Sequence, residues 1–276
     1  MTTLGLLVIL GVAAMLGWRL LDRLADQREM KRLVNLQPQT PAFFSAAMVA
    51  QLPDPARRYF RFAIAEGTPL LTVADLKMFG QFSLGTKDRP NYMPMRAHQI
   101  LAPLGGFVWK MAGRSGHLSV SGSDSARWTR FWLGGIVPVA RLGGDTDHAR
   151  AAFGRYVAEA VFWVPAALLP RPDVTWQEVN ANTSRVTLRR GALVQSVDVT
   201  VAEDGRPTQV VFLRWSNANP EKIFQFQPFG GYLSNFQKVQ GFRVPLHVEA
   251  GNFFGTDAYF PFFIVDVDEI TFPPAD

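Results

Sequence analysis

Near the middle of the chain runs the segment Arg155-Tyr156-Val157-Ala158-Glu159-Ala160-Val161-Phe162-Trp163-Val164-Pro165. It belongs to a longer alanine-rich stretch that no helix breaker interrupts before Pro165, and this pattern predicts a helix over residues 148–169. Asp147 is suited to cap its N-terminus. On both sides of this predicted helix, the sequence consists of short apolar segments divided by Gly, Asn, Asp and Pro, which is typical of strands. Because neighbouring strands with no helix between them can pair only antiparallel, the sequence predicts one large, strongly curved antiparallel sheet that closes around helices.

The predicted strands form one series before the helix and one after it. The first series covers residues 71–84, 93–101, 107–112, 117–121 and 127–133, and the second covers 174–179, 185–189, 193–201, 207–215, 224–226, 232–239, 242–250 and 264–272. Several joints have hairpin composition, for example Gln240-Gly241. Two short helices are expected before the first strand. Ser45 can cap the first, which reaches residue 51, and Asp54 followed by Pro55 can start the second, which reaches about residue 65.

The N-terminus is predicted to be a membrane anchor. Residues 2–18 carry no charge, and a helix over residues 2–21 spans roughly the 30 Å of a bilayer core. A cleaved signal peptide would show a basic start and a small-residue cleavage site, which this segment lacks, so the anchor is expected to stay attached. We therefore expect a transmembrane helix at 1–23, a juxtamembrane helix and linker at 24–41, and a single body at 42–276.

The basic residues that flank this helix indicate its orientation. All of them follow the apolar stretch: Arg19, Arg23, Arg28, Lys31 and Arg32. Positive charge favours the cytoplasmic side, so the prediction is a single-pass protein of the bacterial inner membrane with a cytoplasmic body, and a periplasmic body is the alternative. The fold class is then α+β and mainly antiparallel β: a large curved sheet or half-barrel with a few helices, preceded by one transmembrane helix.

Composition excludes several classes of function. Of the 276 residues 48% are hydrophobic and 18% charged, which is typical of a folded globular chain. The absence of cysteine excludes disulfides, thiol nucleophiles and Cys-ligated metals. The 28 Lys and Arg only slightly exceed the 23 Asp and Glu, so nucleic acid is not an expected partner. The histidines have no metal-binding spacing, and no nucleotide-binding glycine motif or GxSxG elbow occurs, so we predict no metal and no cofactor.

Glu159 is the one acid in the apolar segment quoted above. Tyr156 and Trp163, on its own side of the helix, should bury it, and a buried carboxylate needs a partner. Arg155 lies one turn before it, and a second source of cations is the helix that carries Arg57, Arg58 and Arg61. We favour a structural role as an ion-paired residue. A general acid or base with a raised pKa is the alternative, and no catalytic residue is predicted.

Aromatic residues crowd the last third of the chain beyond what a one-faced strand requires. Either the sheet is buried on both faces there or it lines an apolar cavity. The candidate ligand-binding residues are Phe224, Phe226, Phe229, Tyr232, Tyr259 and Phe260.

Three segments together resemble a known family: Leu52-Pro53-Asp54-Pro55-Ala56-Arg57-Arg58-Tyr59, then residues 155–170, then Gly241-Phe242-Arg243-Val244-Pro245. They are similar to a bacterial family of domains of unknown function, the 6544 type, whose centre reads Tyr-x-Ala-Glu-Ala-x-x-Trp-x-Pro. The residues that carry this motif here are Arg57, Tyr59, Arg155, Tyr156, Glu159, Trp163 and Pro165, and we interpret them as structural. In element order the chain also resembles the half-barrels of LolA and LolB type lipoprotein carriers, which hold acyl chains in an apolar concavity. It departs from that comparison because its expected anchor is a membrane helix, without the lipidated cysteine of a lipoprotein.

Three functions follow, in this order. The first is a membrane-anchored, non-enzymatic protein that binds a lipid or other apolar ligand in its curved sheet, with membrane lipid as partner. The second is an accessory subunit of a membrane protein complex, and the third is an enzyme that uses Glu159. A deep apolar pocket favours the first, and a filled core favours the second.

Overall fold

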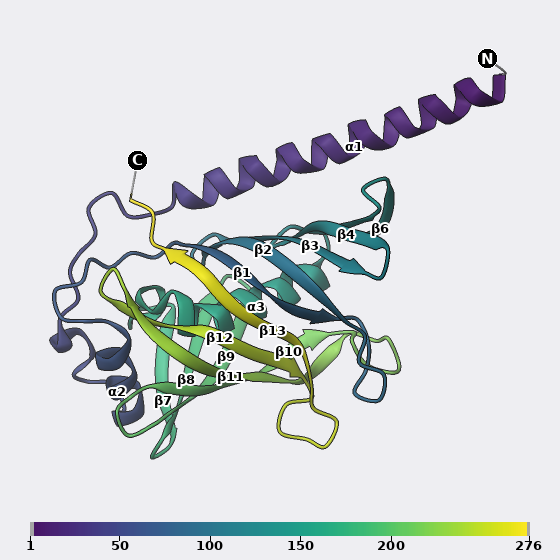
Figure 1. Ribbon diagram of the computed structural model, residues 1–276. Coiled ribbons are helices and arrows are strands. Elements are labelled where there is room, and N and C mark those ends of the chain that lie inside the picture. The colour runs from purple at the N-terminus through teal and green to yellow at the C-terminus, as the bar shows by residue number, and fades with distance from the viewer. Residues whose placement is uncertain (1–2, 275–276) are drawn as a thin grey trace.

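A computed structural model describes residues 3–274 and shows thirteen strands of that range in one antiparallel sheet (Figure 1). The sheet order is β6-β5-β4-β3-β2-β1-β13-β12-β11-β10-β9-β8-β7. Strands that follow each other in sequence therefore pair, except β6 and β7 at the two edges, and β1 also pairs with β13. The strands are β1 Ala74–Ser83, β2 Tyr92–Ala102, β3 Gly106–Ser115, β4 Leu118–Ser125, β5 Trp128–Leu133, β6 Val137–Gly143, β7 Val174–Asn180, β8 Thr183–Arg190, β9 Leu193–Val201, β10 Pro207–Ser216, β11 Gln225–Val239, β12 Phe242–Asn252 and β13 Phe260–Thr271. The predicted fold class, a curved antiparallel sheet with a few helices, is confirmed.

Helix α3, Thr146–Trp163, links β6 at one edge of the sheet to β7 at the other. It therefore crosses the concave face, where it packs mainly against β9 and β10 (Figure 1). Gly154 permits this close approach, because a Cβ atom there would lie 2.8 Å from Gln195 Oε1. The predicted helix over 148–169 ends earlier, at Trp163, and a separate short 3-10 helix, η2, follows at Pro165–Leu168.

Two predicted caps were wrong by one or two residues. Asp145, not Asp147, caps α3 by accepting a hydrogen bond from the His148 backbone N–H, while the Asp147 carboxylate accepts one from Trp215 Nε1 at 2.8 Å. Helix α2, Asp54–Ala63, has Pro53 at its N-cap. Asp54 lies in its first turn, where a carboxylate favours the helix dipole. The first short helix, η1 Ala46–Val49, is capped by Ser45 as predicted.

Two strand predictions also needed correction. Strand β6 was missed because glycines bound it and Pro138 lies within it, yet an edge strand tolerates proline. The predicted strands at 224–226 and 232–239 are a single strand, β11, that runs through Gly230-Gly231. These glycines do not break the strand. A Cβ atom at Gly231 would lie 2.3 Å from the Glu249 backbone oxygen on β12, so the pair allows close contact between strands.

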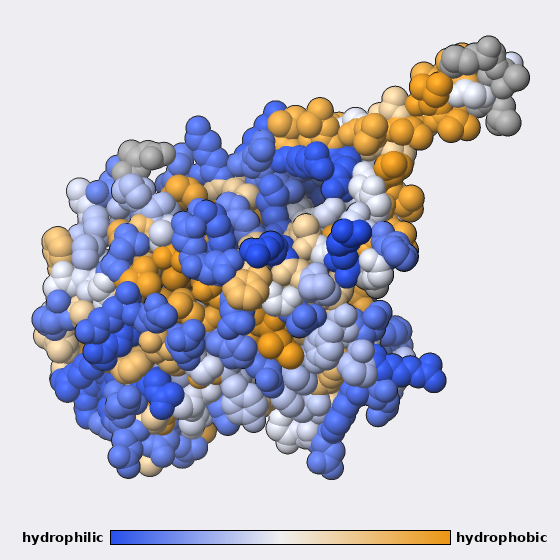
Figure 2. All heavy atoms as spheres, in the orientation of Figure 1, coloured by the Kyte–Doolittle hydropathy of each residue, from blue (hydrophilic) through white to orange (hydrophobic). Residues whose placement is uncertain are grey.

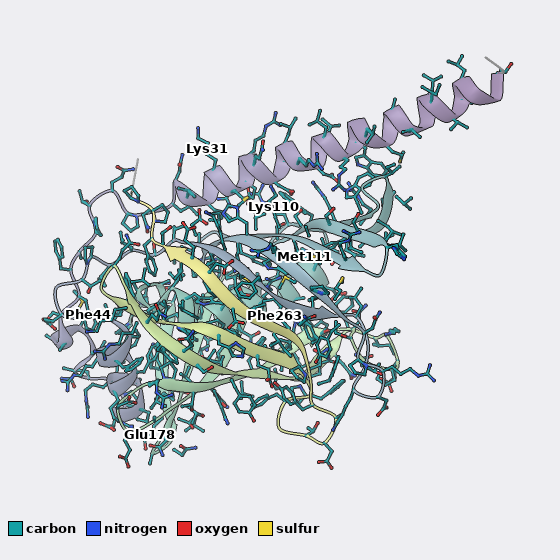
Figure 3. The ribbon with its side chains drawn as sticks, in the orientation of Figure 1. Lys31, Phe44, Lys110, Met111, Glu178 and Phe263 are labelled. Carbon is teal, nitrogen blue, oxygen red and sulfur yellow. The ribbon has the colours of Figure 1, made fainter. Side chains whose placement is uncertain are left out.

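Helix α1, Thr3–Val34, packs with its C-terminal half on the outer face of the sheet, opposite α3 (Figure 1). Met30 and Leu33 form a small core with Val73, Ile100 and Val108. Lys110, next to Val108 on β3, also points to this outer side (Figure 3). The segment that follows is tied down as well, because the buried Gln37 side chain hydrogen-bonds the backbone of Thr72, Val73 and Pro273. The predicted linker therefore contacts the body.

Acidic residues of α1 hold the helix to the sheet. The Asp22 carboxylate accepts hydrogen bonds from Trp132 Nε1 at 3.0 Å and from Arg141, and it also pairs with Arg130 at 3.3 Å. One turn further on, Ser123 Oγ donates to Asp26 at 2.7 Å. The N-terminal half of α1 projects past the body and shows a hydrophobic surface (Figure 2). Within the described residues, α1 is the one helix long and apolar enough to cross a membrane.

Asp22→Ala should loosen α1 from the sheet, because it leaves two arginines and an indole N–H without their shared acceptor. We expect a loss of about 1–3 kcal/mol in stability and faster hydrogen exchange in residues 18–34. Gln27→Ala, on the exposed side of the same helix, is the control. Equal exchange in both variants would show that Asp22 does not fix the helix.

Candidate functional site

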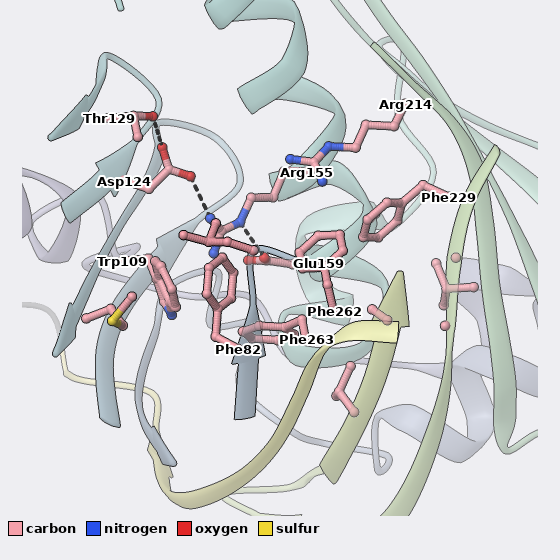
Figure 4. A pocket seen from close by; sticks show the side chains of 18 of the residues that line it. Phe82, Trp109, Asp124, Thr129, Arg155, Glu159, Arg214, Phe229, Phe262 and Phe263 are labelled. Atoms are coloured by element: carbon pink, nitrogen blue, oxygen red, sulfur yellow. Dashed lines mark hydrogen bonds and ion pairs between the residues drawn. The ribbon is translucent and has the colours of Figure 1, made fainter. Parts of the chain in front are cut away.

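A cavity of about 600 Å³ lies between α3 and the concave face of the sheet (Figure 4). Most of its wall is aromatic or aliphatic, contributed by strands from both halves of the sheet and by α3. The aromatic lining residues are Phe82, Trp109, Phe131, Phe162, Trp163, Phe212, Phe229, Phe262 and Phe263. A cavity of this size and character is typical of sites for small apolar ligands.

The alternation of each strand decides which side chains reach the cavity. On β5, Thr129 and Phe131 line the cavity, whereas Arg130 and Trp132 point outward and bind Asp22 of α1. On β3, Trp109 lines the cavity and Val108 packs under α1. The sheet is thus buried on both faces in this half.

A polar cluster stands in one wall of the cavity and is centred on Arg155. Its guanidinium donates to Glu159 Oε1 at 2.7 Å and to Asp124 Oδ2 at 2.7 Å (Figure 4). The Gln99 amide completes it, accepting from Arg155 at 3.2 Å and donating to Glu159 Oε2 at 2.6 Å. Burial acts to lower the pKa of Arg155, but the two carboxylates outweigh it and the pKa is raised. Arg155 is therefore a fixed cation with both of its counterions in place.

Arg214 on β10 also lines the cavity, but it has no such partners. Its guanidinium lies 4.9 Å from the centre of the Phe229 ring, and its Nε is buried with no hydrogen-bond partner in residues 3–274. No carboxylate of that range lies within ion-pair distance of it, and Figure 4 shows the side chain reaching toward Arg155. Burial, and then the charge of Arg155, lower the pKa of Arg214 to about 10. The group is still a cation at neutral pH.

The cavity reaches the surface beside two exposed apolar residues. Leu84 is 76% exposed and Val139, on edge strand β6, is 54% exposed, and both line the cavity. Val139 follows the β5–β6 turn, in which Gly135 lies against the Arg19 guanidinium of α1. One rim of the cavity is therefore close to the point where α1 leaves the body.

Of the six predicted ligand-binding residues, the structure places Phe229 in the cavity wall. Phe224 and Phe226 pack against Trp215, Tyr232 and Tyr259 pack around Phe254, and Phe260 packs on Tyr92. The prediction missed the aromatic residues of the first half, such as Phe82, Trp109 and Phe131. The alternation of apolar and polar residues along each strand could have shown that these aromatic side chains share one face of the sheet. Nothing in the sequence showed that this face lies opposite the last strands.

Most of the motif residues form hydrogen bonds that connect one helix or strand to another. Tyr59 on α2 donates its hydroxyl to the Val161 backbone oxygen, and Trp163 Nε1 donates to the Pro245 oxygen at 3.3 Å. Tyr156 receives a hydrogen bond from Arg190, and Pro165 begins η2. Arg57 pairs with Asp54 on the same helix, so the partner of Glu159 is Arg155 alone among the arginines considered. In residues 3–274 no group of three or more His, Asp or Glu is placed to hold a metal.

The fold and cavity define a class of protein: an open antiparallel half-barrel, wrapped around one helix, that encloses an apolar site. Residues 42–264 match the family of unknown function DUF6544, and the chain belongs to that family.

Two solved structures resemble the fold. A LolA superfamily protein from Nitrosomonas europaea, at 9% identity and a TM-score of 0.39, aligns with 79% of this chain and 92% of its own. A putative outer membrane lipoprotein-sorting protein domain from Vibrio parahaemolyticus, at 11% identity and a TM-score of 0.36, aligns with 72% of this chain and 84% of its own. A search of curated proteins found no match. We therefore argue the function from the cavity itself.

Glu159→Gln should lower stability, because one carboxylate oxygen that now accepts from Arg155 or Gln99 is replaced by a second donor. The expected loss is about 1–3 kcal/mol in thermal unfolding of the full chain. Glu178→Gln, on an exposed position of β7, is the matched control. An unchanged or raised midpoint for Glu159→Gln would contradict the structural role and favour a catalytic one.

Proposed function

We propose that this protein is a membrane-anchored, non-enzymatic binder of a lipid or another long apolar ligand, held in the cavity between α3 and the sheet. The observation that carries the proposal is the cavity itself: about 600 Å³, walled by apolar side chains from both halves of the sheet. At roughly 30 Å³ for each group the size of a water molecule or a methylene, the cavity has room for about twenty such groups, in an extended or a folded-back chain. One acyl chain fits this volume.

The cavity also bears on the two other functions. A filled core would favour an accessory subunit that only caps a membrane complex, and the cavity weighs against that reading. Glu159 lines the cavity, but Arg155 and Gln99 occupy both of its oxygens, which supports a structural rather than a catalytic role.

The position of α1 supports delivery of the ligand from a bilayer. Residues 3–17 extend beyond the body for about 22 Å, which is less than the roughly 30 Å of a bilayer core. Leu20, Leu21 and Leu24 continue the exposed apolar surface on the helix side away from the sheet. A membrane that covers the whole apolar length would thus meet the body beside α1, near the exposed Ile136 and Val137 of the β5–β6 hairpin. The cavity rim at Val139 lies on the same hairpin.

We further propose that this membrane is the bacterial inner membrane and that the body lies in the cytoplasm. The basis is the basic flank after the apolar segment, which contains Arg19, Arg23 and Arg28.

Ala140→Trp should block the cavity from its β6 side, because Ala140 lines it and an indole fills much of a single-chain site. In membranes treated with a photo-crosslinkable hexadecanol, we expect the wild type to be labelled on cavity peptides and the variant to lose at least about nine-tenths of that label. The exposed Ala258→Trp is the control and should keep it. Label of equal strength in the wild type and Ala140→Trp would contradict the proposed site.

A C-terminal alkaline phosphatase fusion, which is active only when exported, should be inactive in cells, because the basic flank retains the body in the cytoplasm. A C-terminal fluorescent protein that folds in the cytoplasm is the reciprocal fusion and should be bright. High phosphatase activity would place the body outside the cytoplasm.

A further inference from the structure

We infer that Arg214 is the binding site for the head of the ligand, and that the ligand is a single-chain amphiphile ending in an oxyanion, a carboxylate or a phosphate. This inference rests on the proposed function and deepens it, because it names the chemical class that the cavity selects.

The charged side chains of the cavity wall are not evenly paired. Two cations and two carboxylates line it, but Arg155 binds both carboxylates, Asp124 at 2.7 Å and Glu159 at 2.7 Å. Arg214 faces the same space with its Nε buried and without an acceptor in the described chain. Because Arg155 takes both carboxylates, an anionic group of the ligand would give the Arg214 guanidinium the counterion that the described chain does not.

A second buried donor, the Trp109 indole, stands in the same wall. Trp109 lines the cavity, and its indole Nε1 is buried with no partner in the described residues. The Arg155 guanidinium lies 5.2 Å from the centre of the Trp109 ring, so Trp109 stands beside the same polar cluster. Buried indole N–H groups usually find an acceptor. Because protein atoms cover both Trp109 Nε1 and Arg214 Nε, contact with a head group in the cavity would fall to the terminal nitrogens of the Arg214 guanidinium.

Electrostatics favours an anion over a neutral head. Burial, and then the charge of Arg155, hold the pKa of Arg214 near 10, although the charges of Asp124 and Glu159 act in the opposite direction. An anion beside Arg214 relieves both effects, whereas an alcohol or ester relieves neither fully. The planar guanidinium fork matches the two oxygens of a carboxylate or phosphate. The rest of the wall, including Phe229 and Phe262, is apolar and suits the chain.

The test compares heads on one chain length. Full-length protein in nanodiscs of phosphatidylcholine is labelled with photo-crosslinkable hexadecanol, and unlabelled palmitate, hexadecyl phosphate or hexadecanol competes. We expect at least one of the two anions to compete at a concentration about tenfold or more below that of hexadecanol. This difference in competing concentration is the size expected from one charge-assisted hydrogen bond. The better of the two anions identifies the head.

Variants then assign the effect to Arg214. Arg214→Met should abolish the advantage of the anion and leave competition by hexadecanol unchanged, and Arg214→Lys should restore part of the advantage. Arg243→Met is the matched control, because Arg243 lies on β12 over the Phe62 ring, outside the cavity. Should Arg214→Met not fold, the comparison of heads on the wild type still decides the question.

Two failures are distinguishable. Equal competition by all three heads, on a wild type whose cavity peptides are labelled, overturns the role of Arg214 and leaves the proposed function standing. Absence of label from the cavity peptides overturns the proposed function itself.

Discussion

The whole architecture depends on one connection. Helix α3 must join the first edge strand of a single sheet to the last, so it has to cross the concave face. The helix packs against β9 and β10, where Gly154 allows a close approach. It makes fewer contacts with the strands on the opposite side of the cavity. The β1–β13 pairing closes the other side by joining the two halves of the chain. The cavity is the space that a straight helix leaves inside a curved sheet, and it is apolar because both surfaces that bound it face the core.

Most charged residues of the cavity wall belong to one cluster, and their pairing explains the central motif. Arg155 and Glu159 lie one turn apart on α3 and reach Asp124 on β4 and Gln99 on β2. The cluster therefore ties the helix to the half of the sheet from which it otherwise stands away. Near the C-terminal end of α3, Tyr59 on α2 donates to the Val161 backbone oxygen and Trp163 donates to the Pro245 backbone oxygen on β12, so the helix is also joined to α2 and to the second half of the sheet. The motif residues therefore form the hydrogen bonds that hold α3 to the elements around the cavity.

The sequence was most informative where a pattern is local. Alternation and hairpin composition located most strands, and the prolines located the end of α3. Strand β6 was missed because Pro138 and its flanking glycines are typical of a loop, and only its place at the edge of the sheet makes it possible. The cavity wall was only partly predictable, because Trp109 and Phe263 are far apart in sequence and meet only through the β1–β13 pairing. The role of Asp22 could not be predicted, since nothing local in the sequence shows that Trp132 and Arg141 donate hydrogen bonds to it.

Because α1 continues without a break from its projecting end into its contact with the sheet, the body has no hinge about which to turn. With α1 embedded in a membrane, as we propose, the protein could not carry a ligand through the aqueous space between two membranes, as a freely diffusing shuttle does. On the same proposal its movement would be lateral, within the plane of one membrane, and the unbroken helix would set its orientation toward that plane. Exchange of ligand with a second membrane protein would then require collision within the plane of the membrane, at the cavity rim beside Val139.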